Sequence, residues 1–151
     1  MAIEVGKNIE MIKDLFSAIG RRDVTAILNY LDENVDWQSP ATGTTVKEIS
    51  WSKPRHGKAE VLAFFNEVRS RLFLDDMAYT TIMADGDHVV AEGSMRGNVI
   101  STGCFFRADF AMVFTLRDGK IVHFRNYYDS AEIAAAFHVK GEECRAVLKA
   151  A

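Results

Sequence analysis

The sequence predicts an α+β fold, in which a curved antiparallel sheet forms a cone closed by N-terminal helices. Two observations predict this fold. Apolar residues recur at helical spacing in the first part of the chain, whereas residues from Leu72 onward read as strands separated by turn signals. The chain has 151 residues, which suits one domain with one core. We therefore expect a single domain over 1–151, with its core at about 8–137 and a C-terminal extension at 138–151.

Composition excludes several classes of protein. Hydrophobic residues make up 48% of the chain and charged residues 26%, the balance of a soluble globular protein. A net charge of -3 argues against a nucleic-acid partner, and no apolar run is long enough to span a membrane. Cys104 and Cys144 do not make a disulfide framework, so we expect free thiols in a reduced, cytoplasmic protein. The histidines show no metal-ligand spacing, and we expect neither a metal nor a cofactor.

The first helix is predicted from apolar residues that recur every three or four positions between Ile9 and Ile19. Gly20 ends this helix, because glycine is the preferred residue just past a helix C-terminus. Asp23 then provides an N-cap for a second helix. These two helices come before every predicted strand, so they are available to cover one face of the sheet.

A polar stretch at 41–53 lies between two prolines and predicts a long loop or flap. The short strand before it, residues 35–39, places Trp37 and Ser39 on one face, because side chains alternate along a strand. After the flap, Gly57 opens a third helix.

Three hairpin signals divide the rest of the chain: Asp85-Gly86, Thr102-Gly103 and Asp118-Gly119. The strands that they separate lie at roughly 74–83, 88–101, 104–117 and 120–129. Ser130 caps a final short helix that runs through Phe137. Residues 142–150 could add one or two further turns.

The register of these strands decides which side chains face the interior, since a slip of one residue moves every side chain to the other face. A two-residue turn in the last hairpin would mix apolar and charged groups on both faces. A three-residue loop with Gly119 in a bulge separates them, so we predict that register. With a two-residue loop in the middle hairpin, it places Arg96 opposite Asp109 and Phe110 opposite Asn126.

The predicted inner face then carries no charge. It consists of Ala91, Gly93, Met95, Gly97, Val99, Phe106, Ala108, Phe110, Met112, Phe114, Phe124, Asn126 and Tyr128. Its glycines and alanines would leave room beneath them, for a ligand or for neighbouring bulky side chains. The strand at 74–83 keeps two possible registers, which turn inward either Asp75, Met77, Tyr79 and Thr81 or Asp76, Ala78, Thr80 and Ile82.

The outer face is broad, and no helix is left to cover it. It mixes apolar groups such as Val113 and Tyr127 with charged groups such as Arg96 and Asp109. Such a surface is self-complementary, and closed two-fold dimers are the commonest assembly. We therefore expect a homodimer through this face, which light scattering would test.

Three motifs carry a resemblance to a known family. They are Val-Asp-Trp-Gln-Ser-Pro at 35–40, Ile-Ser-Trp-Ser-Lys-Pro-Arg-His-Gly at 49–57, and the segment 113–129 that ends in Arg-Asn-Tyr-Tyr-Asp. Together with the order of elements, they resemble SnoaL-like, ketosteroid-isomerase-like proteins of the nuclear-transport-factor-2-like superfamily, over residues 8 to about 137. The resemblance implies the cone fold but no single activity, because this fold hosts isomerases, cyclases, epoxide hydrolases, dehydratases and non-catalytic binders.

The resemblance also implies that the known catalytic groups are missing. Ketosteroid isomerase, a worked case of pKa tuning, uses an aspartate base beside a tyrosine and a protonated aspartic acid. Those positions correspond here to Ser39, Leu15 and Met112, and the acid/base aspartate of SnoaL-like cyclases also aligns near Met112. The Asp-Arg-Asp set of limonene-epoxide-hydrolase-like enzymes falls at Gly93, Met95 and Asn126.

We predict a pocket between the inner sheet face and the first and third helices. Its candidate ligand-binding residues are Trp37, Ser39, Trp51, Phe65, Met95, Phe110, Met112, Phe124, Asn126 and Tyr128. No catalytic residue is assigned, and the weak candidates are Asn126, Tyr128, Asp75, Asp76 and His56. Asn126 and Tyr128 either anchor a ligand carbonyl or hydroxyl, or hydrogen-bond within a filled core.

Two functions fit this pocket. One is an isomerase, cyclase or hydratase that acts on a hydrophobic oxygenated substrate. The other is a non-catalytic ligand-binding or interaction module that has lost the catalytic acids of the family. A carboxylate or histidine near Tyr128 would favour the enzyme, whereas a pocket with only Asn, Tyr, Ser and Trp would favour the binder. In either case we expect a neutral, mostly apolar ligand with one or two oxygens.

Overall fold

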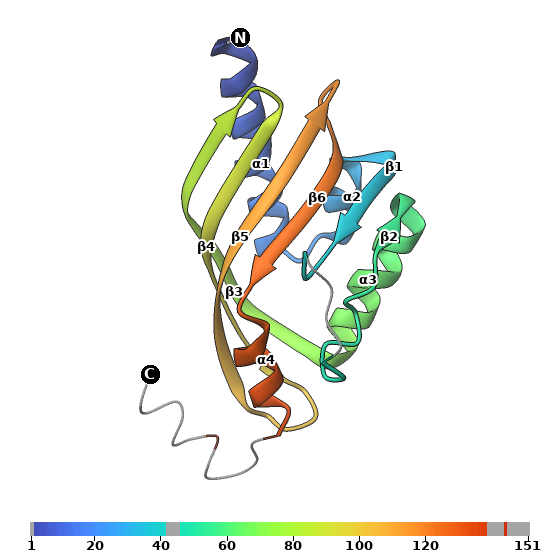
Figure 1. Cartoon of the computed structure of the whole chain (residues 1–151), viewed down its shortest axis with the longest axis vertical. Coiled ribbons are helices and arrows are strands. Elements are labelled where there is room, and N and C mark those ends of the chain that lie inside the picture. Colours follow the sequence, from blue (N-terminus) through green and yellow to red (C-terminus); the bar gives the residue numbers. More distant parts are fainter. Residues whose placement is uncertain (1, 42–45, 139–143, 145–151) are drawn as a thin grey trace.

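The computed structural model describes residues 2–41, 46–138 and 144, and it has the predicted α+β architecture (Figure 1). Its elements are α1 (Ala2–Gly20), α2 (Val24–Asn29), β1 (Leu31–Gln38), β2 (Arg55–His56), α3 (Gly57–Arg71), β3 (Leu72–Asp85), β4 (His88–Val99), β5 (Phe105–Arg117), β6 (Lys120–Tyr128) and α4 (Ser130–Ala136). In the described part of the chain, no helix is long and apolar enough to cross a membrane.

The strands form one open, curved six-stranded sheet in the order β2-β1-β6-β5-β4-β3. All neighbours pair antiparallel except β1 and β6, which run parallel. Helix α1 packs against β3, α3 against β1, and α4 against β5. Figure 1 shows α1 and α2 behind the sheet and α3 beside its β1 and β2 edge, so the helices cover one face.

The helix boundaries follow local chemistry. The Asp23 side chain caps α2 by accepting a hydrogen bond from the Ala26 N–H at 3.0 Å, as predicted. Gly57 begins α3 with a φ of +80°, a left-handed conformation that glycine adopts without strain. The predicted cap at Ser130 is wrong, because Ser130 is already the first helical residue and Asp129 holds the cap position.

The predicted three-residue loop in the last hairpin is also wrong. Arg117 pairs with Lys120 around a two-residue turn, and both turn residues have positive φ, the signature of a type I′ turn. A bulge after Thr115 then restores the predicted faces, since it inserts one extra residue into β6. Phe110 therefore pairs with Tyr128 rather than with Asn126.

The middle hairpin differs from the prediction by a longer connection. Arg96 pairs with Arg107, and Ser94 takes the place opposite Asp109. Since this error amounts to two residues, every side chain keeps its predicted face, and Asp109 points outward with its carboxylate 3.5 Å from Arg107. Exposed groups such as Tyr127 remain on this outer face, and its use for dimerisation stays a prediction.

Strand β3 follows neither predicted register along its whole length. Bulges after Leu74 and after Tyr79 change its phase twice. As a result, Met77 is partly buried as in one register and Ile82 as in the other, while Asp75 and Asp76, one of which each register turned inward, are both exposed.

The inner glycines of β4 do not leave the room that the sequence suggested. A Cβ at Gly93 would collide with the backbone carbonyl of Ala78, and one at Gly97 with the carbonyl of Phe73. These glycines instead let β3 approach β4 closely.

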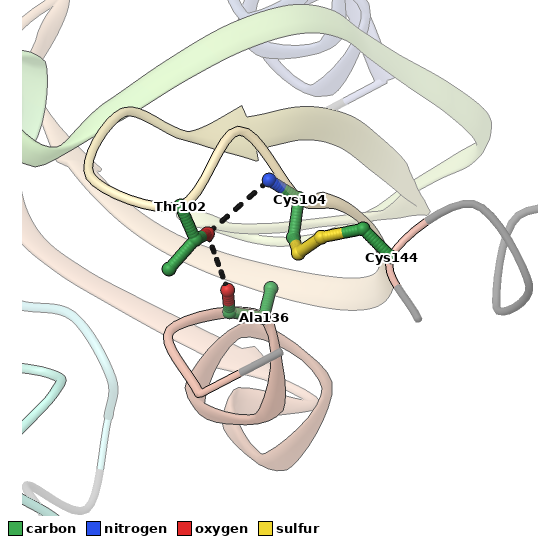
Figure 2. The surroundings of a disulfide bond; sticks show 4 residues. All are labelled: Thr102, Cys104, Ala136 and Cys144. Atoms are coloured by element: carbon green, nitrogen blue, oxygen red, sulfur yellow. Dashed lines mark hydrogen bonds between the residues drawn. A yellow bond between two sulfur atoms is a disulfide. The ribbon is translucent and has the colours of Figure 1, made fainter. Parts of the chain in front are cut away.

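A disulfide joins Cys104 to Cys144, so the prediction of free thiols is wrong (Figure 2). Beside it, the Thr102 hydroxyl donates to the Ala136 carbonyl at 2.7 Å and accepts from the Cys104 N–H at 3.2 Å. The connection between β4 and β5 is therefore attached both to the end of α4 and to Cys144.

Candidate functional site

An apolar cavity of about 130 Å³ lies between the inner sheet face and the helices. We call it the inner chamber. Every predicted ligand-binding residue lines it except Phe110, whose ring stacks on Phe16 at 6.0 Å between centroids. The rest of the wall was not among the predicted ligand-binding residues, and it includes Leu15, Ile19, Ile27, Phe64, Val68, Arg69, Leu72, Leu74, Met77, Phe114 and Ile133.

Trp37 on β1 forms the centre of an aromatic wall. Its ring stacks on Phe124 at 3.9 Å and meets the edges of Phe64 and Phe65 at 5.6 and 5.5 Å. The Trp37 side chain is 6% exposed, and its Nε1–H has no hydrogen-bond partner among the described residues. A buried donor without a partner loses its hydration and gains nothing in return.

Asn126 on β6 is the second unsatisfied polar group. It is 5% exposed, and its Oδ1 has no partner in the described part of the chain. The Asn126 backbone carbonyl accepts from the Ala41 N–H at 2.8 Å, which ties the start of the flap to this point of β6. Of the two roles that the sequence left open for Asn126, hydrogen bonding within a filled core does not account for its Oδ1.

Tyr128 lies two residues further along β6, on the same face. Its hydroxyl accepts a hydrogen bond from the Trp51 Nε1–H at 3.0 Å. This bond connects Trp51 of the flap to strand β6 of the sheet. Burial raises the pKa of Tyr128 to about 12, and hydrogen bonding to Trp51 and Ser39 offsets part of that rise. The phenol is therefore neutral at physiological pH.

The described part of the flap, residues 46–53, is bound to three neighbouring elements. Gln38 donates to the Ser52 carbonyl at 2.7 Å, and Arg71 of α3 donates to the Ser50 hydroxyl at 2.6 Å. The Glu48 carboxylate contacts the His138 ring beyond α4 at 2.6 Å. A hydrogen bond from its own backbone N–H, and then the contact with His138, lower the pKa of Glu48. Ile49 and Trp51 are buried beneath these bonds.

The weak catalytic candidates of the sequence lie outside the inner chamber, apart from Asn126 and Tyr128. His56 is exposed and its ring contacts Asp36 at 2.8 Å, while Asp75 and Asp76 are exposed on β3. Among the described residues, no carboxylate and no imidazole line the inner chamber, and no cluster of His, Cys, Asp or Glu could hold a metal ion.

The positions that correspond to the catalytic groups of ketosteroid isomerase lie in this chamber. Ser39, Leu15 and Met112 all line it. None of these side chains can act as the carboxylic acid or base that general acid–base catalysis needs at neutral pH. The described lining of the chamber therefore contains the three positions that the resemblance assigned, without a carboxylate or an imidazole at any of them.

A second, wider cavity of about 350 Å³ adjoins the first, and we call it the outer chamber. Charged side chains line it, namely Arg22, Arg69, Asp75 and Asp76. Neither arginine was among the predicted site residues. A signal for Arg69 was present, because it follows the predicted pocket residue Phe65 by four positions, and such residues share one face of a helix.

Known proteins resemble this chain over most of its length. The family model for the SnoaL-like domain matches residues 12–124. YesE, an uncharacterised protein of Bacillus subtilis strain 168, is 27% identical over 137 residues, which are 89% of each chain.

Two solved structures extend the likeness to the fold. A nuclear-transport-factor-2-like protein from Burkholderia xenovorans is 25% identical, with a TM-score of 0.72 over 87% of this chain and 96% of its own. A candidate isomerase from Bacillus subtilis is also 25% identical, with a TM-score of 0.70 over 87% of this chain and 93% of its own.

Proposed function

Because the chain belongs to the SnoaL-like domain family, we propose that its inner chamber binds the mostly apolar, oxygen-bearing part of a small molecule. We further propose that it holds this ligand without acid–base catalysis by its own side chains. One observation carries the proposal. Trp37 Nε1 and Asn126 Oδ1 are buried, lack partners among the described residues, and belong to side chains that line one apolar cavity.

The energetics favour a ligand over an empty chamber. Each buried polar group without a partner costs about 1–3 kcal/mol. A ligand hydroxyl can accept a hydrogen bond from one group and donate to another, whereas a hydrocarbon can satisfy neither. The rest of the wall is aromatic and aliphatic, which suits a ring or a branched chain.

An isomerase-, cyclase- or hydratase-type activity is the second candidate. The neutral Tyr128 phenol favours it, since such a group can polarise a ligand carbonyl. This activity would need a base from water or from the ligand itself, because the described lining of the chamber offers none. Conversion of a bound ligand, rather than binding alone, would distinguish it from the binder.

The binding proposal is tested with two ligands of nearly equal shape, p-cresol and p-xylene, which differ by a hydroxyl against a methyl group. Titration calorimetry is expected to give p-cresol an affinity about three- to tenfold higher, the value of one hydrogen bond. In Asn126→Leu this preference should shrink or vanish. Tyr127→Phe, the adjacent tyrosine on the exposed face, should keep it.

Two results would contradict the proposal. Equal affinity for the two ligands in the unmodified protein would mean that the polar atoms do not bind a ligand. An Asn126→Leu protein that unfolds, with no effect on the preference in the milder variant Asn126→Ser, would mean that the amide is structural.

A further inference from the structure

The two chambers are connected by shared walls. Arg69 lines both of them, together with apolar side chains from α1, α3 and β3 such as Ile19, Phe65 and Leu74. Asn126 and Tyr128 border only the inner chamber, whereas Arg22, Asp75 and Asp76 border only the outer one. A ligand that reaches Asn126 through this shared region passes Arg69.

The other charged groups of the outer chamber either have partners or do not border the inner chamber. Arg22 donates to the Leu74 carbonyl at 2.8 Å and its guanidinium covers the Phe73 ring at 4.1 Å. Asp76 is 3.3 Å from Arg96. Asp75 is exposed and does not border the inner chamber. The charge that faces the shared region is therefore positive.

Arg69 has hydrogen-bonding capacity to spare. Within the described residues its one partner is the Asn66 side chain on its own helix, at 2.7 Å. A guanidinium has five N–H donors in a planar fork, which matches the two oxygens of a carboxylate. Arg69 itself is exposed, and apolar neighbours such as Phe65 and Leu72 line the same chamber.

We infer that the ligand is an elongated carboxylic acid, whose apolar, oxygen-bearing end occupies the inner chamber and whose carboxylate binds Arg69. The inference rests on the proposed function and refines it. The neutral ligand that the sequence suggested describes only the inner end of the molecule. Asp75 limits the affinity, because its negative charge repels the same carboxylate.

The test compares 4-phenylbutanoate with 4-phenylbutan-1-ol by titration calorimetry. The unmodified protein is expected to bind the acid about tenfold more tightly than the alcohol. Arg69→Gln should remove this preference, and Asp75→Asn should increase it by about twofold. Arg107→Gln, which removes a positive charge from the outer sheet face, serves as the matched control and should keep the preference.

Salt provides a second measurement on the unmodified protein. Raising the ionic strength should weaken binding of the acid and leave binding of the alcohol nearly unchanged. An equal affinity for acid and alcohol, or a preference that survives Arg69→Gln, would overturn the inference.

The p-cresol titration distinguishes a failure of the carboxylate inference from a failure of the proposed function. If p-cresol binds as proposed and the acid is not preferred, only the carboxylate inference fails. If neither p-cresol nor the acid binds, the proposed function fails with it.

Discussion

The two ends of the connected chambers are built in opposite ways. At the closed end, hydrogen bonds that involve Trp51, Gln38 and Arg71 join the flap to β6, β1 and α3, and a disulfide holds the β4–β5 connection. At the mouth, Asp75 and Arg69 are exposed, and β3 carries two bulges. If the chambers bind a ligand as proposed, we expect the closed end to fix its orientation and the mouth to adapt to its length.

This contrast also predicts where changes matter. Two of the contacts at the closed end are costly to lose: the Trp51–Tyr128 hydrogen bond is partly buried, and the disulfide is covalent. Ties at the mouth are solvent-exposed ion pairs, whose contribution to stability is small. The predictions below test this contrast from the largest expected effect to the smallest.

Breaking the disulfide should have the largest effect. Cys104 and Cys144 are 40 residues apart, and closing a loop of that length stabilises a fold by up to about 4 kcal/mol. The Cys104→Ser variant should therefore unfold at a lower urea concentration than the oxidised protein. Dithiothreitol should lower the urea midpoint of the unmodified protein by the same amount and leave the midpoint of the variant unchanged. An unaltered midpoint would show that the closed end does not depend on this bond.

High pH should weaken the closed end through Tyr128. The folded pKa of about 12 exceeds the unfolded value of 10.0, so only the unfolded chain loses this proton between the two values. The free energy of unfolding should therefore be fully retained below pH 10 and fall by up to about 3 kcal/mol as pH rises to 12. Tyr128→Phe should reduce this fall in urea titrations, and Tyr127→Phe should not. Parallel pH profiles for all three proteins would count against the buried phenol.

A change at the mouth should have the smallest effect on stability. Asp76→Asn removes the charge pair with Arg96, whose two side chains are 49% and 59% exposed. We expect the free energy of unfolding to change by less than about 0.5 kcal/mol in urea titrations. A loss as large as that from Cys104→Ser would remove the distinction between the two ends.

The sequence was most informative where one physical constraint acted over many residues. The faces of β4, β5 and β6 were predicted correctly although both hairpin pairings were wrong. Each of these two pairings was displaced by two residues. Because side chains alternate with a period of two, such a displacement leaves every side chain on the same face, and the requirement for an uncharged inner face cannot detect it. In the last hairpin, the turn favoured by Asp118 and Gly119 and the segregation of faces conflicted, and the bulge after Thr115 reconciles them.

Other features lacked such a constraint. Strand β3 has an exposed aspartate pair and two bulges, so alternation alone could not define its register. The disulfide depends on a distance between Cys104 and a residue 40 positions away, and sequence spacing does not fix such a distance. The sequence could not predict that Asn126 Oδ1 lacks a hydrogen-bond partner among the described residues, since this depends on which neighbours come within hydrogen-bond distance.

The position of the tryptophans has a practical consequence. The chain contains two, Trp37 and Trp51, and both line the inner chamber. Under selective excitation, the intrinsic fluorescence of the protein therefore originates entirely from the walls of this cavity. A ligand that enters the cavity will shift the emission maximum or quench the fluorescence. Compound libraries can therefore be screened against unlabelled protein by its tryptophan fluorescence. Trp37→Phe and Trp51→Phe, measured separately, would then report which side of the cavity each ligand touches.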